Sequence, residues 1–219
     1  MSTAINHQYQ YVFFHLPKNA GTSLSLVFGG NTLHGNKHYT PQDFLKEKGR
    51  DYYNSYYKIV FVRNPYMTLI SNYFYMERQK SFHGLIPTLK DPMPFNYFID
   101  WVCDNIDYTK LMTIEEEVEL QKVGKPTNKY YTQYQWCSEK GSVDSLITLD
   151  FVGKVENIGD DVAKLRRRFF KQEYNTDVPK INISTSGEKI EDMYSKDMMR
   201  KVEDAFSIDF ETFGYNSLC

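Results

Sequence analysis

The sequence has few cysteines, no long apolar run and almost no net charge. Its three cysteines, Cys103, Cys137 and Cys219, are far apart and form no C-x-x-C pair, which argues against a disulfide framework or a thiolate metal site. No stretch approaches the length of a membrane span, and the first residues have neither the positive flank nor the apolar core of a signal peptide. A net charge of −2 offers no basic excess for nucleic acid or an anionic membrane. We therefore expect a soluble, cytoplasmic protein with no membrane span and no nucleic-acid partner.

Short apolar segments alternate with helical patterns along the chain. Strands are expected at residues 11–16 and 58–62, with a strand or hairpin within 145–155. Helices are expected at 21–28, 40–49, 64–78, 95–105, 157–170 and 190–206, and residues 29–36 read as a loop. This alternation predicts a three-layer α/β fold with a central parallel sheet flanked by helices. The length of 219 residues suits a single domain spanning residues 1–219.

Two helix starts are marked clearly. In KHYTPQDFLKEKG, Thr40 is a candidate N-cap, Pro41 suits the first helical position and Asp43 completes a capping box, while Gly49 ends the helix. In the segment RNPYMTLISNYFYMER, which begins at residue 63, an asparagine and a proline mark the start of the next helix in the same way.

The segment FFHLPKNAGTSLSL, residues 13–26, joins an apolar strand to a helix through a short polar turn. Pro17 fixes the exit from the strand, and Gly21 lets the backbone approach a ligand closely. Lys18 adds a mobile positive charge, but it precedes the glycine, the reverse of the order in a nucleoside-triphosphate loop. The segment predicts a loop whose amides bind an oxyanion. The alternative is an ordinary strand-to-helix turn with a solvent-facing lysine.

A second candidate anion site follows the strand at 58–62. Arg63 comes directly after this strand and before a helix, and Ser71 lies two turns along that helix. A guanidinium is a fork-shaped donor suited to phosphate, and a nearby hydroxyl can share the same group. Two anion sites at strand ends of one sheet indicate a ligand with two separated anionic groups.

On these motifs the chain resembles the sulfotransferases. FFHLPKNAGTSL is similar to their 5′-phosphosulfate loop and FVRNPYMTLISNYF to their 3′-phosphate motif. Four further segments resemble the branch of the Golgi carbohydrate sulfotransferases and their bacterial-type relatives, in the same order: KHYTPQDFL, DFVGKVENIGDDVAKL, INIST and DFETFGY. Residues 82–128 have no counterpart in that branch. The resemblance implies a P-loop-NTPase-like fold and the donor 3′-phosphoadenosine 5′-phosphosulfate (PAPS). It also implies the product adenosine 3′,5′-bisphosphate (PAP), no metal, and a hydroxylated acceptor, with a carbohydrate favoured.

The resemblance also assigns residues to the donor. Arg63 and Ser71 would hold the 3′-phosphate, and a loop containing Thr185 and Ser186 would close over the nucleotide. Asn19 stands where many relatives have threonine, and we expect little effect from it because backbone amides carry the loop. The residues that would cradle the 5′-phosphosulfate are Lys18, Asn19, Ala20, Gly21, Thr22 and Ser23.

Sulfuryl transfer needs a group that stabilises the leaving oxygen and a base for the acceptor hydroxyl. Lys18 is the candidate for the first role, and a histidine is the natural candidate for the second. His38 precedes a well-capped helix and matches a histidine of the resembled sequences, so it is the predicted base, with His34 as the nearest competitor. The others are His7 in an expected loose terminus, His15 within a strand and His83 in a loop. Glu156, before a helix, suits a structural role better than a catalytic one.

Two other functions remain open on the sequence alone. A P-loop kinase would require G-x-x-x-x-G-K-[ST] and a magnesium-binding aspartate, and neither is present. An inactive module that binds the nucleotide or sulfated glycans is the other, and Lys18 and His38 argue against it. The RRR run at 166–168 and the tyrosines of DYYNSYY, residues 51–57, fit structural roles better than a basic patch or a sugar platform.

Overall fold

The computed structural model describes residues 3–29, 31–32, 39–79, 93–109, 130–139, 146–171, 175–179 and 187–219. The chain divides into two compact units. The first unit comprises Met1–Asn64 and Leu146–Ile183, and the second comprises Pro65–Ser145 and Ser184–Cys219. The single domain expected from the length stays a prediction.

The first unit is built on a five-stranded sheet in the order β3-β1-β2-β4-β5. Its strands are β1 (Ala4–Asn6), β2 (Tyr11–Phe14), β3 (Asn31–Thr32), β4 (Tyr57–Val62) and β5 (Phe151–Lys154). The predicted parallel sheet is confirmed for β2, β4 and β5, whereas β1 runs antiparallel to both β2 and β3. The loop predicted at 29–36 is wrong at residues 31–32, because this short segment pairs with β1.

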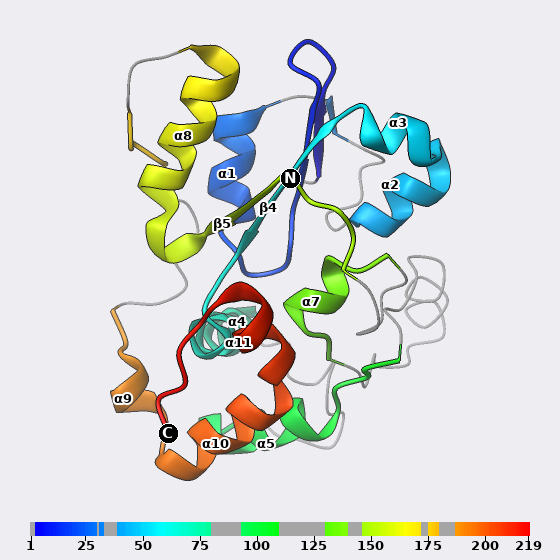
Figure 1. The fold of residues 1–219 in the computed structure, drawn as a ribbon. Coiled ribbons are helices and arrows are strands. Elements are labelled where there is room, and N and C mark those ends of the chain that lie inside the picture. The colour runs from blue at the N-terminus through cyan, green and yellow to red at the C-terminus, as the bar shows by residue number, and fades with distance from the viewer. Residues whose placement is uncertain are drawn as a thin grey trace. The chain divides into compact units, whose positions relative to one another are not determined.

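Helices cover both faces of the sheet, as Figure 1 shows. On one face lie α1 (Gly21–Phe28) and α8 (Ile158–Phe170), whose Leu24 and Leu165 pack with Phe13 in one buried cluster. On the other lie α2 (Pro41–Lys48) and α3 (Arg50–Asn54), where Phe44 meets the ring of Phe14. Neighbouring strand residues point to opposite faces, so Phe13 and Phe14 anchor the two helical layers separately. The three-layer α/β prediction is confirmed for this unit.

The predicted capping of α2 is also confirmed. The Thr40 side chain accepts the Asp43 N–H, the Asp43 carboxylate accepts the Thr40 N–H, and Pro41 begins the helix. Gly49 ends the helix with a φ of 83°, in the region that favours glycine. The capping box therefore fixes where the chain enters α2.

The second unit is helical within its described residues. Its helices are α4 (Pro65–Gln79), α5 (Phe95–Asp104), α7 (Gln133–Trp136), α9 (Ile190–Met193), α10 (Lys196–Ala205) and α11 (Ser207–Phe213). The single helix predicted at 190–206 is wrong. The chain is extended at Tyr194 and Ser195, and the Ser195 side chain caps a new helix by accepting the Met198 N–H.

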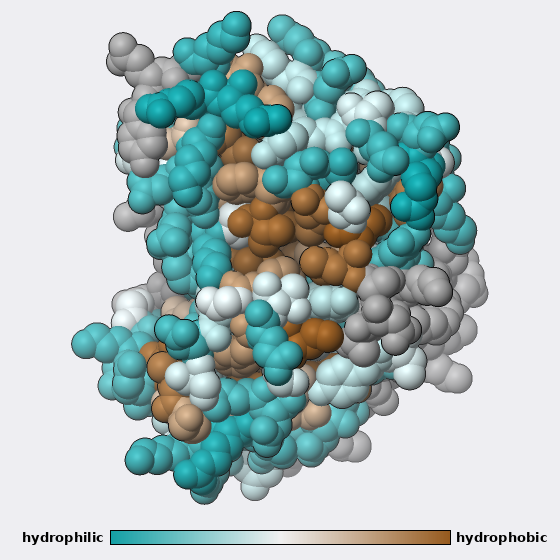
Figure 2. Space-filling model, in the orientation of Figure 1, coloured by the Kyte–Doolittle hydropathy of each residue, from teal (hydrophilic) through white to brown (hydrophobic). Residues whose placement is uncertain are grey.

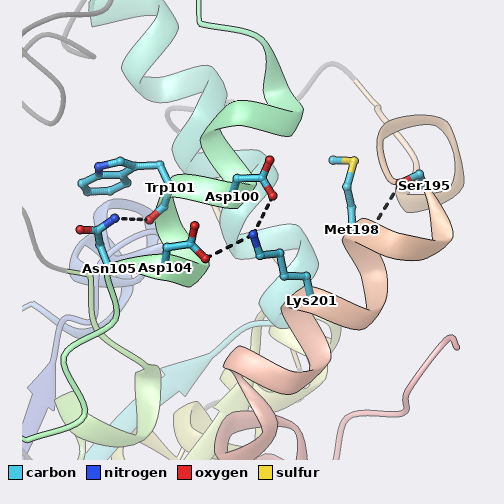
Figure 3. A network of polar contacts seen from close by, with 7 residues as sticks. All are labelled: Asp100, Trp101, Asp104, Asn105, Ser195, Met198 and Lys201. Carbon is cyan, nitrogen blue, oxygen red and sulfur yellow. Dashed lines mark hydrogen bonds and ion pairs between the residues drawn. The ribbon is translucent and has the colours of Figure 1, made fainter.

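An ion-pair network joins α5 and α10 (Figure 3). The Lys201 ammonium lies 2.8 Å from a carboxylate oxygen of Asp100 and 3.2 Å from one of Asp104. All three side chains are partly exposed, and such surface pairs contribute roughly 0–1 kcal/mol each to stability. The apolar core of this unit, which includes Tyr66, Leu69, Ile70 and Phe98, is therefore the stronger link between its helices.

Hydrophilic side chains cover α8 and the α2–α3 pair in Figure 2, whereas hydrophobic side chains gather over the strands between them. Val152 of the edge strand β5 is 40% exposed. Among the residues that the structure describes, no helix combines the length and apolar character needed to cross a membrane.

Candidate anion-binding site

The loop between β2 and α1 has an unusual backbone. Lys18 and Ala20 have φ values of 63° and 56°, in the left-handed region that non-glycine residues rarely adopt. Each such residue costs about 1–2 kcal/mol, so surrounding contacts must hold the loop in this shape. Left-handed residues in a tight turn aim successive N–H groups into one concavity, the arrangement that binds oxyanions. The backbone of this loop is therefore compatible with an anion site, and anion binding by the loop stays a prediction.

Gly21 is required for a reason that the sequence did not reveal. A β-carbon at Gly21 would overlap the imidazole ring of His15, which packs against the glycine backbone. The missing side chain thus makes room for a half-buried ring at the end of β2. The close approach of a ligand that the sequence predicts at Gly21 stays a prediction.

The first turn of α1 fits an anion. No side chain caps its N-terminus, and no acidic residue lies in its first turn. The N-terminal amides of a helix and its dipole both favour negative charge. Thr22 in this turn is half-buried, and Ser23 is buried. Two hydroxyls therefore lie beside these amides.

Asn19 links the loop to a neighbouring strand. Its side chain is 2% exposed, and its Nδ2 donates a hydrogen bond to the carbonyl oxygen of Phe61 in β4, at 2.9 Å. The sequence predicts little effect from asparagine in place of threonine at this position. Instead it ties the loop to the neighbouring strand, so its role is to anchor the loop.

Arg63 also meets the loop. It is half-buried directly after β4, and its Nη1 lies 3.4 Å from the carbonyl oxygen of Lys18. The structure thereby brings together the first predicted anion motif and the arginine of the second. Both lie at the carboxyl ends of parallel strands, where α/β sheets bind their ligands.

Ser71 belongs to the second unit, where it lies in α4 and is 2% exposed. The other predicted site residues, His38, Thr185 and Ser186, lie outside the described residues, as do His34 and His83. Their roles stay predictions.

His7 does not lie in a loose terminus, and that expectation is wrong. It follows β1 in the tight turn to β2, and its Nδ1 lies 2.7 Å from the hydroxyl of Tyr56. This turn precedes β2, so it lies at the opposite edge of the sheet from the anion loop. His7 is therefore not a group of this site.

Thr3 is a buried polar residue that sequence reasoning missed. Its hydroxyl donates to the carbonyl oxygen of Tyr39 at 2.7 Å and accepts the N–H of His15 at 3.2 Å. It thus ties the entry to α2 to the end of β2, from which the anion loop leaves. No local pattern marks Thr3, since its partners come from distant parts of the chain.

The structural interpretation of two other features is supported. Arg166 donates to the carbonyl oxygens of Asn175 and Asp177, and the Arg168 guanidinium lies 4.2 Å from the ring centre of Tyr57. In DYYNSYY, Tyr53 is buried and donates to the Thr148 carbonyl oxygen at 2.8 Å. These side chains serve packing within the first unit.

The cysteines behave as isolated thiols. No disulfide links them, and burial raises the pKa of Cys103 to about 12. Within the part of the chain that the structure describes, no cluster of three or more His, Cys, Asp or Glu side chains could hold a metal ion.

Comparison with known proteins adds a family. A model described as "Sulfotransferase family" matches residues 1–216. Carbohydrate sulfotransferase 12 of Xenopus laevis is 27% identical over 173 residues, which cover 73% of this chain. The match covers only 40% of that relative's length. No solved structure matches the chain significantly.

Proposed function

Because the chain belongs to the sulfotransferase family, we propose that it transfers a sulfuryl group from PAPS to a hydroxyl group of a carbohydrate. The observation that carries the proposal is the contact between the two predicted anion motifs. The left-handed loop before α1 and the guanidinium after β4 meet at 3.4 Å. Such a pair suits a donor that carries one anionic group on each side of a ribose.

The residues at this edge fit the donor chemically. The amides and hydroxyls at the start of α1 would hold the 5′-phosphosulfate, since they supply donors without an opposing carboxylate in that turn. Arg63 would hold the 3′-phosphate, the group to which the resemblance also assigns Ser71. Lys18 is half-buried within the loop and adds the positive charge that a desolvated phosphosulfate needs.

When bound, the donor supplies the sulfuryl group and a phosphate leaving group. The bond from sulfur to the acceptor oxygen forms while the bond from sulfur to the bridging phosphate oxygen breaks, by in-line displacement. The Lys18 ammonium would stabilise the negative charge that develops on that bridging oxygen, or donate a proton to it. His38 would accept the proton of the acceptor hydroxyl. The chain would thus act mainly by positioning and electrostatics.

The similarity to the Xenopus relative supports a carbohydrate acceptor. That protein is a carbohydrate sulfotransferase, and this chain matches part of it. A panel of oligosaccharides is therefore the first set of acceptors to test, ahead of phenols and peptides.

Binding calorimetry with three nucleotides tests the donor site. PAP, adenosine 5′-monophosphate and ATP differ in the presence of a 3′-phosphate and in the length of the 5′ chain. We expect PAP to bind more tightly than the monophosphate, and Arg63→Ala to remove most of that difference. Preferential binding of ATP with magnesium, or equal affinity for PAP and the monophosphate, would contradict the proposed donor.

A further inference from the structure

Two side chains cross between the anion loop and β4 in opposite directions. The Asn19 amide donates to the backbone of β4 at Phe61, and the Arg63 guanidinium, two residues further on, reaches the backbone of the loop at Lys18. Each motif therefore supplies a side chain to the other's main chain. The sequence shows neither link, because 42 and 45 residues separate the partners.

The Asn19 bond extends the pairing between two strands. β2 pairs with β4 as far as Phe14 and Val60, so Phe61 is the first residue of β4 beyond this ladder. There the chain of β2 has turned toward the loop, and the Asn19 side chain takes up the Phe61 carbonyl instead. The Asn19 side-chain amide thus extends the hydrogen bonding between β2 and β4 by one residue beyond the last backbone pair. This fixes the loop against β4 just before Arg63.

The loop needs such an anchor. Lys18 and Ala20 hold left-handed backbone on either side of Asn19, and residues of these types return to ordinary conformations unless contacts prevent it. Asn19 is buried between them, so its hydrogen bond is shielded from water. Without this hydrogen bond, neither the left-handed conformation of the loop nor the position of the loop relative to Arg63 would be fixed.

We propose that Asn19 is a positioning residue that couples the two halves of the donor site. It holds the loop and Arg63 at a fixed separation, so that the 5′ and 3′ anionic groups of one nucleotide are bound together. This inference rests on the proposed function, since it assumes that the donor carries both groups. Asn19 then contributes to recognition of the 3′-phosphate without touching it.

The test measures how much the 3′-phosphate contributes to binding. Calorimetry gives the affinities of PAP and of adenosine 5′-monophosphate, and their ratio reports that contribution. Asn19→Leu removes the donor at nearly constant volume, and Asn19→Ala is a second variant in case the first folds poorly. Ser25→Ala is the matched control, because it removes a side-chain hydrogen bond of α1, to the Gly21 carbonyl oxygen, away from β4.

We expect the PAP affinity to fall about tenfold in Asn19→Leu, the equivalent of one buried hydrogen bond. The PAP-to-monophosphate ratio should fall as well, and Asn19→Leu should lower it no further in an Arg63→Ala background. Ser25→Ala should keep the wild-type PAP affinity and the wild-type PAP-to-monophosphate ratio. A folded Asn19 variant with the wild-type ratio would overturn the inference and leave the donor site intact. A wild-type protein with no preference for PAP would instead refute the proposed donor.

Discussion

The carboxylate of Glu156 accepts a hydrogen bond from the backbone N–H of Asn64 at 2.8 Å. Glu156 lies in the 3₁₀ helix η2 (Val155–Asn157) after β5, and Asn64 lies one residue after Arg63. The contact therefore joins the ends of two adjacent parallel strands. It supports the structural role expected for Glu156, and it places a negative charge near the residue proposed to hold a phosphate.

Substitution of Glu156 separates these two effects. Glu156→Gln keeps an oxygen acceptor for Asn64 and removes the charge, so PAP affinity should be equal to or tighter than wild type. Glu156→Ala loses the hydrogen bond and should lower Tm by about 2–4 °C, as expected for a loss near 1 kcal/mol in a chain of this length. Calorimetry and thermal unfolding measure both. A glutamine variant that binds PAP more weakly than the wild type would point to a direct role of the charge.

Lys18→Ala should reduce turnover more than donor binding. Its ammonium is proposed to stabilise charge that develops on the leaving oxygen, an effect that is largest in the transition state. We expect kcat to fall by about 100-fold or more, within the range for loss of one such electrostatic contact, while PAP affinity falls less. Lys18→Arg, which keeps the charge, is the matched control. Equal losses in kcat and in PAP affinity would mean that Lys18 only binds the donor.

His38→Ala should nearly abolish transfer and leave PAP binding unchanged. The proposed role is proton removal from the acceptor, which is not required for nucleotide binding. Steady-state rates and calorimetry on the same preparation test both parts, and His34→Ala is the natural comparison. Near-normal rates in His38→Ala, together with a loss in His34→Ala, would transfer the role to His34.

A buried carboxylate in the second unit predicts a pH effect on stability. Asp209 in α11 is 0% exposed and accepts the N–H groups of Gln133 and Tyr134 at 2.9 and 2.8 Å. Burial raises its pKa from 3.8 to about 6, even though these hydrogen bonds act in the opposite direction. Between these values the native protein keeps a proton that the unfolded chain has lost. The contribution of Asp209 to stability therefore decreases as pH rises from about 4 to about 6.

Thermal unfolding of wild type and Asp209→Asn across this pH range measures the effect. The unfolding free energy of the wild type, relative to that of Asp209→Asn, should decrease by an amount on the order of 3 kcal/mol as pH rises. The asparagine variant lacks the Asp209 carboxyl, so its pH dependence gives the contribution of all the other titrating groups. A difference that stays constant with pH would show that Asp209 keeps an ordinary pKa.

Local signals predicted much of the first unit. The capping box at Thr40 and Asp43, the strands at 11–16 and 58–62, and the helix at 21–28 all depend on neighbouring residues, and the structure confirms them. The single helix predicted at 190–206 is wrong because the sequence signal for the break is confined to the cap at Ser195.

Contacts between distant residues could not be predicted. β1 has only three residues, too few for a local pattern, and it forms a strand because it pairs with β2 and β3. The same holds for Asn19 with Phe61, Thr3 with Tyr39, and His15 against Gly21. The sequence indicated which residues form the anion loop, but the contacts that hold its shape come from other strands.

Transfer of labelled sulfate from PAPS is the most direct test of the central claim. The purified protein is incubated with PAPS and a panel of oligosaccharides in the presence of a metal chelator, and products are read by mass spectrometry. We expect a sulfated product and PAP from wild type, with little product from Lys18→Ala or Arg63→Ala. Phosphate transfer from ATP, or tight PAP binding with no sulfated product from any hydroxylated acceptor, would contradict the account.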